Sequence, residues 1–508
     1  MSVRPFGATP AARRVAVLVV LAVLAALALA FGGYGLARAD AGLSTRRATV
    51  DGVPLTEVRA TGVAGRRPGV VIAHGFAGSA RLMRPIADTV ARQGAVAMLV
   101  DVAGHGANPA RLPGAGRDAA DSRAILERDL SVAVAYLRTR PDVDPARIVL
   151  VGHSMGAGAV TRYAAGHPDI ARTVAISLPD SDDLPDDLPD GRPDGLLLIV
   201  GGAEFPAFRD TAEATSRRGV GRRLVVVPGV EHISVLFAGR THDEVAAWVG
   251  GGADPPRPLA RLAPAGLLLL GFGLGFVPLA TLLLGRRPRP SRPAAPTPAV
   301  LAVAASAAGL GALVGALAPT TRLPLAVGGH VTGFLLVTGV LRAAAARWWP
   351  LPAATSTPVP ATAPVARRAP VRSALAAVLL TGYAVTAVAV PIHLGFTSAL
   401  PVGDRWWLLP VVAAACLVFL TGAELATAGR SWRYAAVGGI AVLALTASAV
   451  VGLAPGFVLL VVPLFAVLVG WQAAWAAVLR RAGPPRWLPA LVGAALLAWP
   501  MATTLPLS

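Results

Sequence analysis

The chain has 508 residues, a mean hydropathy of +0.62 and a formal net charge of +18. The charge is unevenly spread, because residues 40–252 hold 24 arginines against 25 acidic residues and the rest of the chain holds 22 against 3. The arginine excess lies at the ends of apolar segments, which indicates membrane topology and argues against nucleic-acid binding. Cys416 is the only cysteine, which excludes an intrachain disulfide.

The first apolar segment is Val15 to Ala37, behind the basic residues 1–14. Its 23 uncharged residues are enough to cross a bilayer core of roughly 30 Å. A cleaved signal peptide is the alternative, and Ala37-Arg38-Ala39 loosely resembles its cleavage site, but its apolar core would be only about 7–15 residues long. We therefore predict an uncleaved signal anchor over 15–37, with residues 1–14 in the cytoplasm and the next domain outside.

Residues 40–252 alternate short apolar runs with helical patterns, which predicts a doubly wound, mostly parallel sheet. A hairpin is expected over Ala48–Arg59, around Asp51-Gly52, and Thr241 with Glu244 predicts a capping box before the last helix. The expected strands are Gly69–Ala73, Ala95–Val100, Ile148–Val151, Thr173–Ser177, Leu196–Val200 and Arg223–Val227, and the expected helices are 79–92, 118–139, 155–166, 206–218 and 242–249.

From Arg261 onward the pattern changes to long apolar spans, which predicts an all-α membrane region over 262–505. With residues 40–252 outside, 14 arginines of the region 262–505 fall in cytoplasmic loops and only two, Arg322 and Arg405, fall in outer loops. The sequence thus predicts a multi-pass protein of the cytoplasmic membrane with nine spans, residues 40–252 outside, and Pro-rich cytoplasmic loops at Arg286–Pro298 and Pro350–Pro370. The eight spans after the anchor are 262–284, 298–318, 323–341, 373–396, 406–428, 434–453, 456–479 and 487–505.

The motif Gly152-His153-Ser154-Met155-Gly156 follows an apolar strand and opens a helical run. G-x-S-x-G in that context is typical of a nucleophile elbow, in which the serine stands clear of the sheet. A serine hydroxyl needs an adjacent base, and His232, after the last strand, is the best candidate. His153 is adjacent to the serine in sequence and should point away from it, and His167 and His242 lie on or beside helices.

The histidine needs a carboxylate to orient it, and the chain offers several. Glu204 follows the strand Leu196–Val200 and gives the order serine, acid, histidine. Asp180 or Asp182, after the preceding strand, and Asp210, a few residues later, are the alternatives.

With these motifs, residues about 45–250 resemble the α/β-hydrolases, in particular serine esterases and lipases, whereas the membrane region resembles no known family. The resemblance implies an oxyanion hole formed by the N–H of Met155 and that of Phe76, in the loop His74–Gly78. It also implies that the loop Asp101–Gly106 is structural, with His105 near the mouth of the site but not catalytic. No metal-ligand spacing is found, and the chemistry needs no cofactor.

The insert Leu178–Gly195, where such enzymes often carry a lid, is short, acidic and Pro-rich. The site is therefore either open to solvent or roofed by the bilayer and the membrane region. We expect a solvated acidic loop in preference to a Ca²⁺ site. Four polar residues in or beside the spans, His330, His393, Asp404 and Glu424, are expected to make hydrogen bonds between packed elements.

The hypothesis is a membrane-anchored serine hydrolase that cleaves ester, thioester or acyl bonds, or transfers the acyl group, on an envelope or membrane-lipid substrate. The rival hypothesis is a transporter or signalling protein whose outer hydrolase-like domain is a binding module. The expected partners are the substrate and the lipid bilayer, with no nucleic acid.

Overall fold

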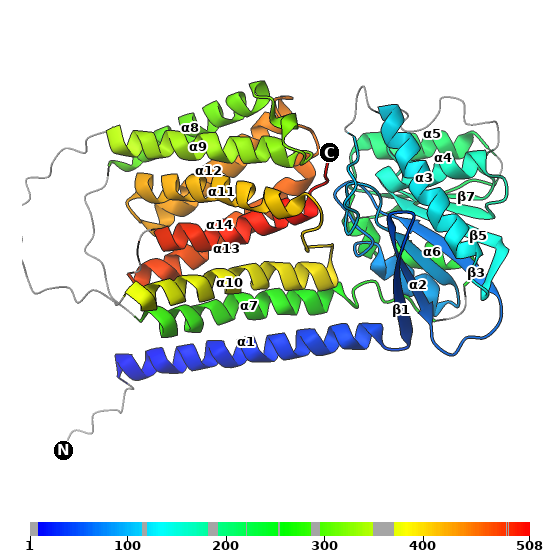
Figure 1. Cartoon of the computed structure of the whole chain (residues 1–508), viewed down its shortest axis with the longest axis horizontal. Helices are drawn as coiled ribbons and strands as arrows, with labels where there is room; N and C mark the ends of the chain where they lie inside the picture. The colour runs from blue at the N-terminus through cyan, green and yellow to red at the C-terminus, as the bar shows by residue number, and fades with distance from the viewer. Residues whose placement is uncertain are drawn as a thin grey trace, which may run out of the picture. The chain divides into compact units, whose positions relative to one another are not determined.

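The computed structural model describes residues 9–113, 119–180, 192–219, 221–251, 254–285, 295–348, 370–483, 485 and 487–508. The chain divides into two compact units (Figure 1). The sheet unit comprises Phe31–Gly266, Pro391–Arg405 and Thr503–Ser508, and the helical unit comprises the remaining segments.

The sheet unit is built on an eight-stranded sheet in the order β1-β2-β4-β3-β5-β6-β7-β8. The pairs β1–β2 and β2–β4 are antiparallel and all the others are parallel. Asp51 and Gly52 have φ values of 47° and 81°, as a tight hairpin turn requires, so the predicted hairpin is confirmed and extends on both sides. The strands are β1 Leu43–Val50, β2 Val53–Ala60, β3 Arg67–Ala73, β4 Val96–Val100, β5 Val143–His153, β6 Arg172–Ile176, β7 Leu196–Gly201 and β8 Arg223–Val227.

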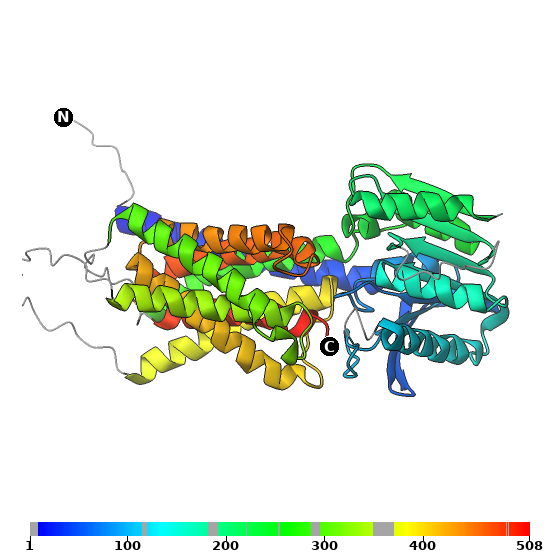
Figure 2. The ribbon, with the colours of Figure 1, turned by 90° about the horizontal axis from the view of Figure 1, so that it is seen from above.

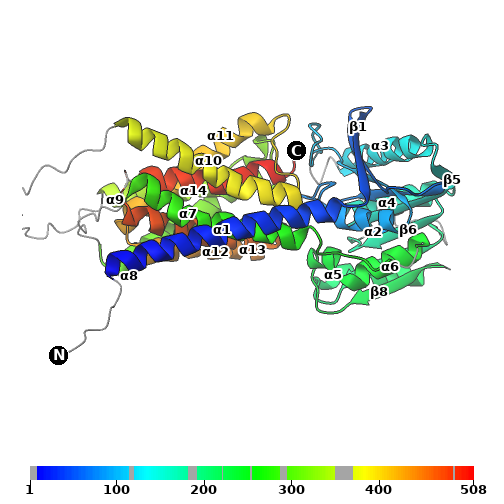
Figure 3. The ribbon, with the colours of Figure 1, turned by 90° about the horizontal axis from the view of Figure 1, so that it is seen from below.

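Helices cover both faces of this sheet, as the strand–helix alternation predicts (Figures 2 and 3). α2 (Arg84–Arg92) and α6 (Gly239–Val249) bury apolar side chains such as Ile86 and Val245 against one face. α3 (Ala119–Arg138) and α4 (Met155–Gly166) bury Leu130 and Val160 against the other, and α5 (Pro206–Arg217) packs beside β7 and β8. The parallel strands are thus buried on both sides, which explains their continuous apolar sequences.

Two local predictions are wrong. α6 begins at Gly239, with Ala238 at its N-cap and no side-chain cap, so the capping box of Thr241 and Glu244 does not form. Glu244 instead makes ion pairs with Arg223 and Arg240 at 2.6 and 2.7 Å. α2 begins at Arg84 rather than at residue 79, because Pro85 fits only the first turn of a helix.

Two segments distant in sequence complete the sheet unit, and we call Pro391–Arg405 and Thr503–Ser508 together the clasp. Leu507 exchanges backbone hydrogen bonds with the loops after β4, donating to the Gly104 carbonyl at 2.9 Å and accepting from the Leu112 N–H at 3.0 Å. Arg405 is fully buried and donates to the carbonyls of Gly104 and Leu505 at 2.8 and 3.2 Å. The clasp therefore holds the loop Asp101–Leu112 from outside the hydrolase-like stretch of the sequence.

Nine helices in the described residues are long and apolar enough to cross a membrane, in agreement with the predicted multi-pass architecture. α1 and α7 run side by side (Figures 1 and 3), since a Cβ at Gly271 would lie 2.8 Å from the Leu29 side chain. The helices are α1 Pro10–Asp40, α7 Leu262–Leu284, α8 Thr297–Leu317, α9 Gly328–Trp348, α10 Pro370–Gly395, α11 Arg405–Thr427, α12 Ser431–Val450, α13 Val458–Arg481 and α14 Trp487–Thr504.

α9 differs most from its predicted span, 323–341. It starts only after Pro324, which has no N–H to donate, and it runs on to Trp348. Arg342, counted from the sequence as a cytoplasmic loop residue, is therefore a fully buried helix residue whose guanidinium lies 5.0 Å from the centroid of the Phe419 ring. The Pro-rich connectors fall largely outside the described residues.

The polar residues of the spans mostly make the expected contacts. Glu424 of α11 pairs with Arg480 of α13 at 2.7 Å, and His330 Nδ1 donates to the Gly315 carbonyl at 3.2 Å. Within the clasp, His393 Nδ1 accepts the Ala399 N–H at 3.3 Å. Asp404 accepts hydrogen bonds from Arg111, which lies on the loop after β4.

Candidate active site

Ser154 occupies the sharp turn between β5 and α4, with φ 52° and ψ −121°. A residue with a side chain rarely adopts a positive φ. Here the Ser154 N–H donates to the Ile176 carbonyl at 2.9 Å, which holds the backbone in place. Both motif glycines are sterically required. A Cβ at Gly152 would lie 2.2 Å from the Gly156 carbonyl oxygen, and one at Gly156 would lie 2.6 Å from the Ala73 and His74 carbonyl oxygens. The local fold is thus a nucleophile elbow.

Ser154, His232 and Glu204 lie in one hydrogen-bonded row. His232 Nε2 is 3.1 Å from Ser154 Oγ, and His232 Nδ1 is 3.0 Å from Glu204 Oε2. The three residues follow β5, β8 and β7, so they meet at the carboxyl edge of the parallel strands. The side chain of His232 is 5% exposed and that of Glu204 is fully buried, which shields their contact from water.

The remaining oxygen of Glu204 is held as firmly as the first. Oε1 accepts hydrogen bonds from the Ser177 hydroxyl at 2.6 Å and from the Gly201 N–H at 2.7 Å. The carboxylate is therefore fixed on both sides, as a group that orients an imidazole must be. The contact of Ser177 with Glu204 could not be predicted, because a serine at the end of a strand carries no motif.

The alternative acids lie elsewhere or cannot be placed. Asp210 is an exposed residue of α5, and Asp180 lies near the Thr211 hydroxyl, at 3.5 Å. Asp182 lies outside the described residues, as does most of the acidic insert Leu178–Gly195. Among these candidate acids, Glu204 is the one that forms a hydrogen bond with the ring of His232 in the described part of the chain.

His153, which we expected to point away from Ser154, contacts the neighbouring His232. Its Nε2 donates to the backbone carbonyl of His232 at 2.9 Å, and the two rings lie 4.8 Å apart. Burial lowers the pKa of His153 well below its ordinary value, so the ring stays neutral. The contact between His153 and the backbone of His232 could not be found from the sequence, although His153 occupies the variable position of the motif.

The other histidines stay apart from the serine. His167 stacks on Tyr163, and His242 is buried between the Thr89 hydroxyl and the Leu236 carbonyl. His105 is buried, its Nδ1 donates to the Ala103 carbonyl at 2.8 Å, and its ring meets Phe76 edge-on. Burial lowers the pKa of His105 well below its ordinary value, which leaves it neutral.

The loop after β3 lies directly against the nucleophile. A Cβ at Gly75 would be 2.9 Å from Ser154 Cβ, so the loop His74–Gly78 approaches the serine as closely as a glycine allows. Phe76 is partly exposed on this loop, and Met155 follows the serine at the start of α4. The assignment of their two N–H groups to an oxyanion hole stays a prediction.

The clasp touches the loops on either side of the row. The Ser79 hydroxyl, just past the loop after β3, is 2.9 Å from the Thr397 hydroxyl and accepts the Ser398 N–H at 3.0 Å. The Phe396 ring stacks on Phe237, five residues beyond His232, with centroids 6.2 Å apart. The sequence left open whether the site is exposed to solvent or covered. In the structure these clasp residues contact Ser79 and Phe237, which lie near the two loops that carry the site.

Comparisons with known proteins support the same fold. The family model Hydrolase_4, "Serine aminopeptidase, S33", matches residues 65–180. Two uncharacterized proteins of Mycobacterium tuberculosis, one from strain CDC 1551 / Oshkosh and one from strain ATCC 25618 / H37Rv, are each 32% identical over 193 residues. That match covers 33% of this chain and 64% of each relative, so the chain spans less than two thirds of their length.

Solved structures resemble the sheet unit as well. Est1E from Butyrivibrio proteoclasticus is 17% identical, with 41% of this chain and 96% of that chain covered and a TM-score of 0.32. The epoxide hydrolase VrEH1 from Vigna radiata is 13% identical, with 41% and 98% covered and a TM-score of 0.33. From its strand order, its nucleophile elbow and the family match, the sheet unit of this chain has the α/β-hydrolase fold, and the described residues also include nine helices long and apolar enough to cross a membrane.

Proposed function

We propose that this protein is a membrane-anchored serine hydrolase that cleaves carboxylic esters or thioesters through an acyl-enzyme on Ser154. The observation that carries the proposal is the row Ser154–His232–Glu204, with contacts of 3.1 and 3.0 Å at the carboxyl edge of the sheet. A binding module would have no need of a buried carboxylate aligned with a histidine and a serine.

The geometry supports the following steps. Glu204 accepts a hydrogen bond from the Nδ1–H of His232. This tautomer leaves Nε2 without a proton, so Nε2 can take the Ser154 hydroxyl proton as Oγ bonds to the substrate carbonyl carbon. The tetrahedral oxyanion would be stabilised by the N–H groups of Phe76 and Met155. When the C–O or C–S bond breaks, the leaving group receives the proton from His232. Water then repeats the sequence on the acyl-enzyme and releases the acid.

Substitution of the nucleophile tests this reaction. Ser154→Ala should lower kcat for short p-nitrophenyl esters about 10⁴–10⁶-fold and abolish labelling by a fluorophosphonate probe, without loss of expression. Because the matching family model is described as a serine aminopeptidase, aminoacyl p-nitroanilides belong in the same assay. More than a tenth of the activity in the alanine variant would refute the assignment, and a wild type that the probe never labels would favour the binding-module hypothesis.

The proposal also places the hydrolase domain on the outer face of the cytoplasmic membrane. The basic residues before α1 and the arginine-rich connectors of the helical region support this orientation, and removing the buried Arg342 from the tally leaves the asymmetry large. From that location we infer an acylated envelope lipid or polymer as substrate, with hydrolysis and acyl transfer as alternative outcomes of the acyl-enzyme.

Topology reporters test the location separately. Alkaline phosphatase fused at Gly250 should be active and a fusion within Pro290–Pro298 inactive, whereas a cytoplasmic fluorescent reporter should give the reverse. A cytoplasmic signature at Gly250 would invert the orientation and remove the reason for an envelope substrate. A preference of the purified protein for small soluble esters over lipid vesicles would leave the topology intact and contradict only the substrate.

A further inference from the structure

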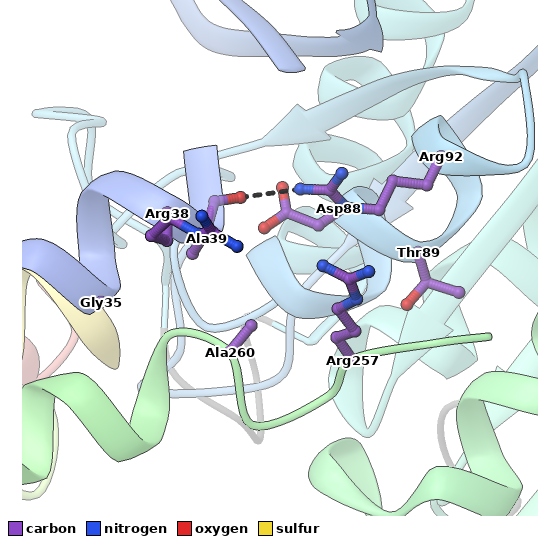
Figure 4. Close-up of a pocket in the computed structure, with 8 residues that line it drawn as sticks. All are labelled: Gly35, Arg38, Ala39, Asp88, Thr89, Arg92, Arg257 and Ala260. Carbon is purple, nitrogen blue, oxygen red and sulfur yellow. Dashed lines mark hydrogen bonds between the residues drawn. The ribbon is translucent and has the colours of Figure 1, made fainter. Parts of the chain in front are cut away.

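A small hollow in the sheet unit lies away from the proposed active site. Its volume is about 120 Å³, and it is bounded by the end of α1, by α2 and by the segment that leads into α7 (Figure 4). The lining residues are Gly35, Arg38, Ala39, Asp88, Thr89, Arg92, Arg257 and Ala260. Three of these eight residues are arginines and one is acidic, so the hollow is a candidate for an anion.

The one acidic lining residue is already neutralised. Asp88 accepts a hydrogen bond from Arg84 on one carboxylate oxygen and from Arg261 on the other, each at 2.6 Å. Neither of these arginines lines the hollow. The three arginines that do line it therefore keep a surplus of positive charge.

The three lining arginines differ in what holds them. Arg92 is fixed, because its Nη2 donates to the Ala39 carbonyl at 2.9 Å (Figure 4) and to the Ala41 carbonyl at 3.1 Å. Arg38 and Arg257 have exposed side chains and form no ion pair with any acid in the described part of the chain. Two guanidinium groups without a counter-ion thus stand beside a third that is anchored.

The hollow lies where two predicted spans end. Arg38 is in the last turn of α1, and Ala260 lies just before Leu262, the first residue of α7. The two helices approach closely here, since a Cβ at Gly35 would lie 2.6 Å from the ring of Pro264. A site at the ends of two spans is at the level of the lipid headgroups.

The usual topology rule does not account for these arginines. In the orientation proposed above they stand on the outer side, where the rule disfavours arginine. On the preceding turns of α1, Phe31 and Tyr34 are each 61% exposed, which is typical of aromatic residues that border a lipid headgroup region. A ligand with an anionic head and apolar chains fits both observations.

We propose that this hollow binds the phosphate group of a membrane phospholipid, whose acyl chains lie along the apolar surface of α1. The planar guanidinium fork matches phosphate oxygens, and arginine is favoured wherever phosphate is recognised. A water molecule takes up about 30 Å³ in the liquid, so a hollow of about 120 Å³ has room for an anion of phosphate size. A free phosphate shares this chemistry, but the position beside two spans favours the lipid.

Lipid retention by the purified full-length protein tests the proposal. The protein is prepared in a phosphate-free detergent, phosphatidylglycerol is added, and the bound lipid is measured by native mass spectrometry. Arg38→Gln and Arg257→Gln should each weaken retention about fivefold, the effect expected for one arginine at a membrane surface. Arg66→Gln, an exposed arginine outside the hollow, is the matched control and should bind as the wild type does.

Further arms of the experiment separate the outcomes. Diacylglycerol of the same chains should bind more weakly than phosphatidylglycerol, and equal binding would overturn the phosphate assignment. Displacement by millimolar glycerol 3-phosphate or inorganic phosphate would reassign the hollow to a soluble phosphate and overturn the lipid. Retention unchanged in both arginine variants would overturn the site itself.

Fluorophosphonate labelling of Ser154 should be unchanged in both variants, which shows that the domain has folded. Labelling depends on the active site, whereas lipid retention does not. A protein that is not labelled can therefore still bind lipid at the hollow, and a protein that does not retain lipid can still be a serine hydrolase.

Discussion

Replacing Glu204 with glutamine gives the sharpest test of the proposed triad, because the surroundings leave the amide one orientation. The Gly201 N–H can only donate, and it lies 2.7 Å from Oε1. The glutamine oxygen must therefore occupy that position, which turns its NH₂ group toward His232 Nδ1, where Glu204 Oε2 now lies at 3.0 Å. An amide N–H cannot accept a proton.

The consequence is a change of tautomer in His232. With a donor opposite Nδ1, the ring must carry its proton on Nε2, the nitrogen that lies 3.1 Å from Ser154 Oγ. It then cannot accept the serine proton. The same tautomer error in a serine protease costs about 10⁴ in kcat, and we expect a loss of that order here, with KM little changed.

The assay is steady-state hydrolysis of a short p-nitrophenyl ester, with the rate of fluorophosphonate labelling as a second measure. Asp210→Asn removes an exposed carboxylate from the neighbouring helix α5 and should change kcat less than about twofold, since surface substitutions have small effects. Activity of Glu204→Gln within tenfold of the wild type would refute the proposed role of Glu204. A severe loss in Asp182→Asn would instead move the acid to the end of β6.

Burial lowers the pKa of His242 to about 4, whereas histidine in an unfolded chain has a pKa near 6.5. The free energy of unfolding should therefore fall by up to about 3 kcal/mol as the pH drops from about 6.5 to about 4. The melting temperature of His242→Gln should depend less on pH in this range, and identical profiles would contradict this. Deletion of Leu505–Ser508 removes two buried leucines and the hydrogen bonds of Leu507 with Gly104 and Leu112, so both the melting temperature and the labelling rate should decrease. Deletion of Ser508 alone should change neither. Glu424→Ala removes the carboxylate that pairs with Arg480 and should destabilise the helical unit by about 1–3 kcal/mol. Thermal unfolding in detergent measures this, and an unchanged melting temperature would show that the ion pair contributes nothing.

Much of the fold follows from local patterns in the sequence. The strand–helix alternation gave a doubly wound sheet, and Asp51-Gly52 predicted the hairpin turn, because each depends on residues close together in the chain. The positions of Ser154 and His232 relative to the strands were also predictable, since parallel strands bring their carboxyl ends to one edge. Errors occurred where a competing contact decides, as with Glu244, which pairs with arginines instead of capping α6.

Long-range contacts were beyond the reach of pattern analysis. Nothing local to Ser177 shows that its hydroxyl holds Glu204, and nothing local to His153 shows that it holds the backbone of His232. The role of Arg405 was equally hidden, because an arginine at the start of a span is typical of an interfacial residue. Its burial depends on Gly104, about 300 residues away in sequence, and such pairings leave no periodic signal.

The clasp has a consequence for biosynthesis. The eight strands are complete by Val227, yet Leu507, which pairs with the loop after β4, is translated about 280 residues later. At about 5–20 residues per second this takes on the order of 10–60 s. The Asp101–Leu112 loop lacks Leu507 throughout that interval, and the Ser79 hydroxyl lacks Thr397 until about 170 residues beyond Val227 have been translated. Maturation of the hydrolase domain is therefore coupled to insertion of the helices that follow it. A nascent chain arrested before α14 would carry an assembled sheet with an incomplete rim, so acquisition of probe reactivity should lag behind protease resistance of the sheet.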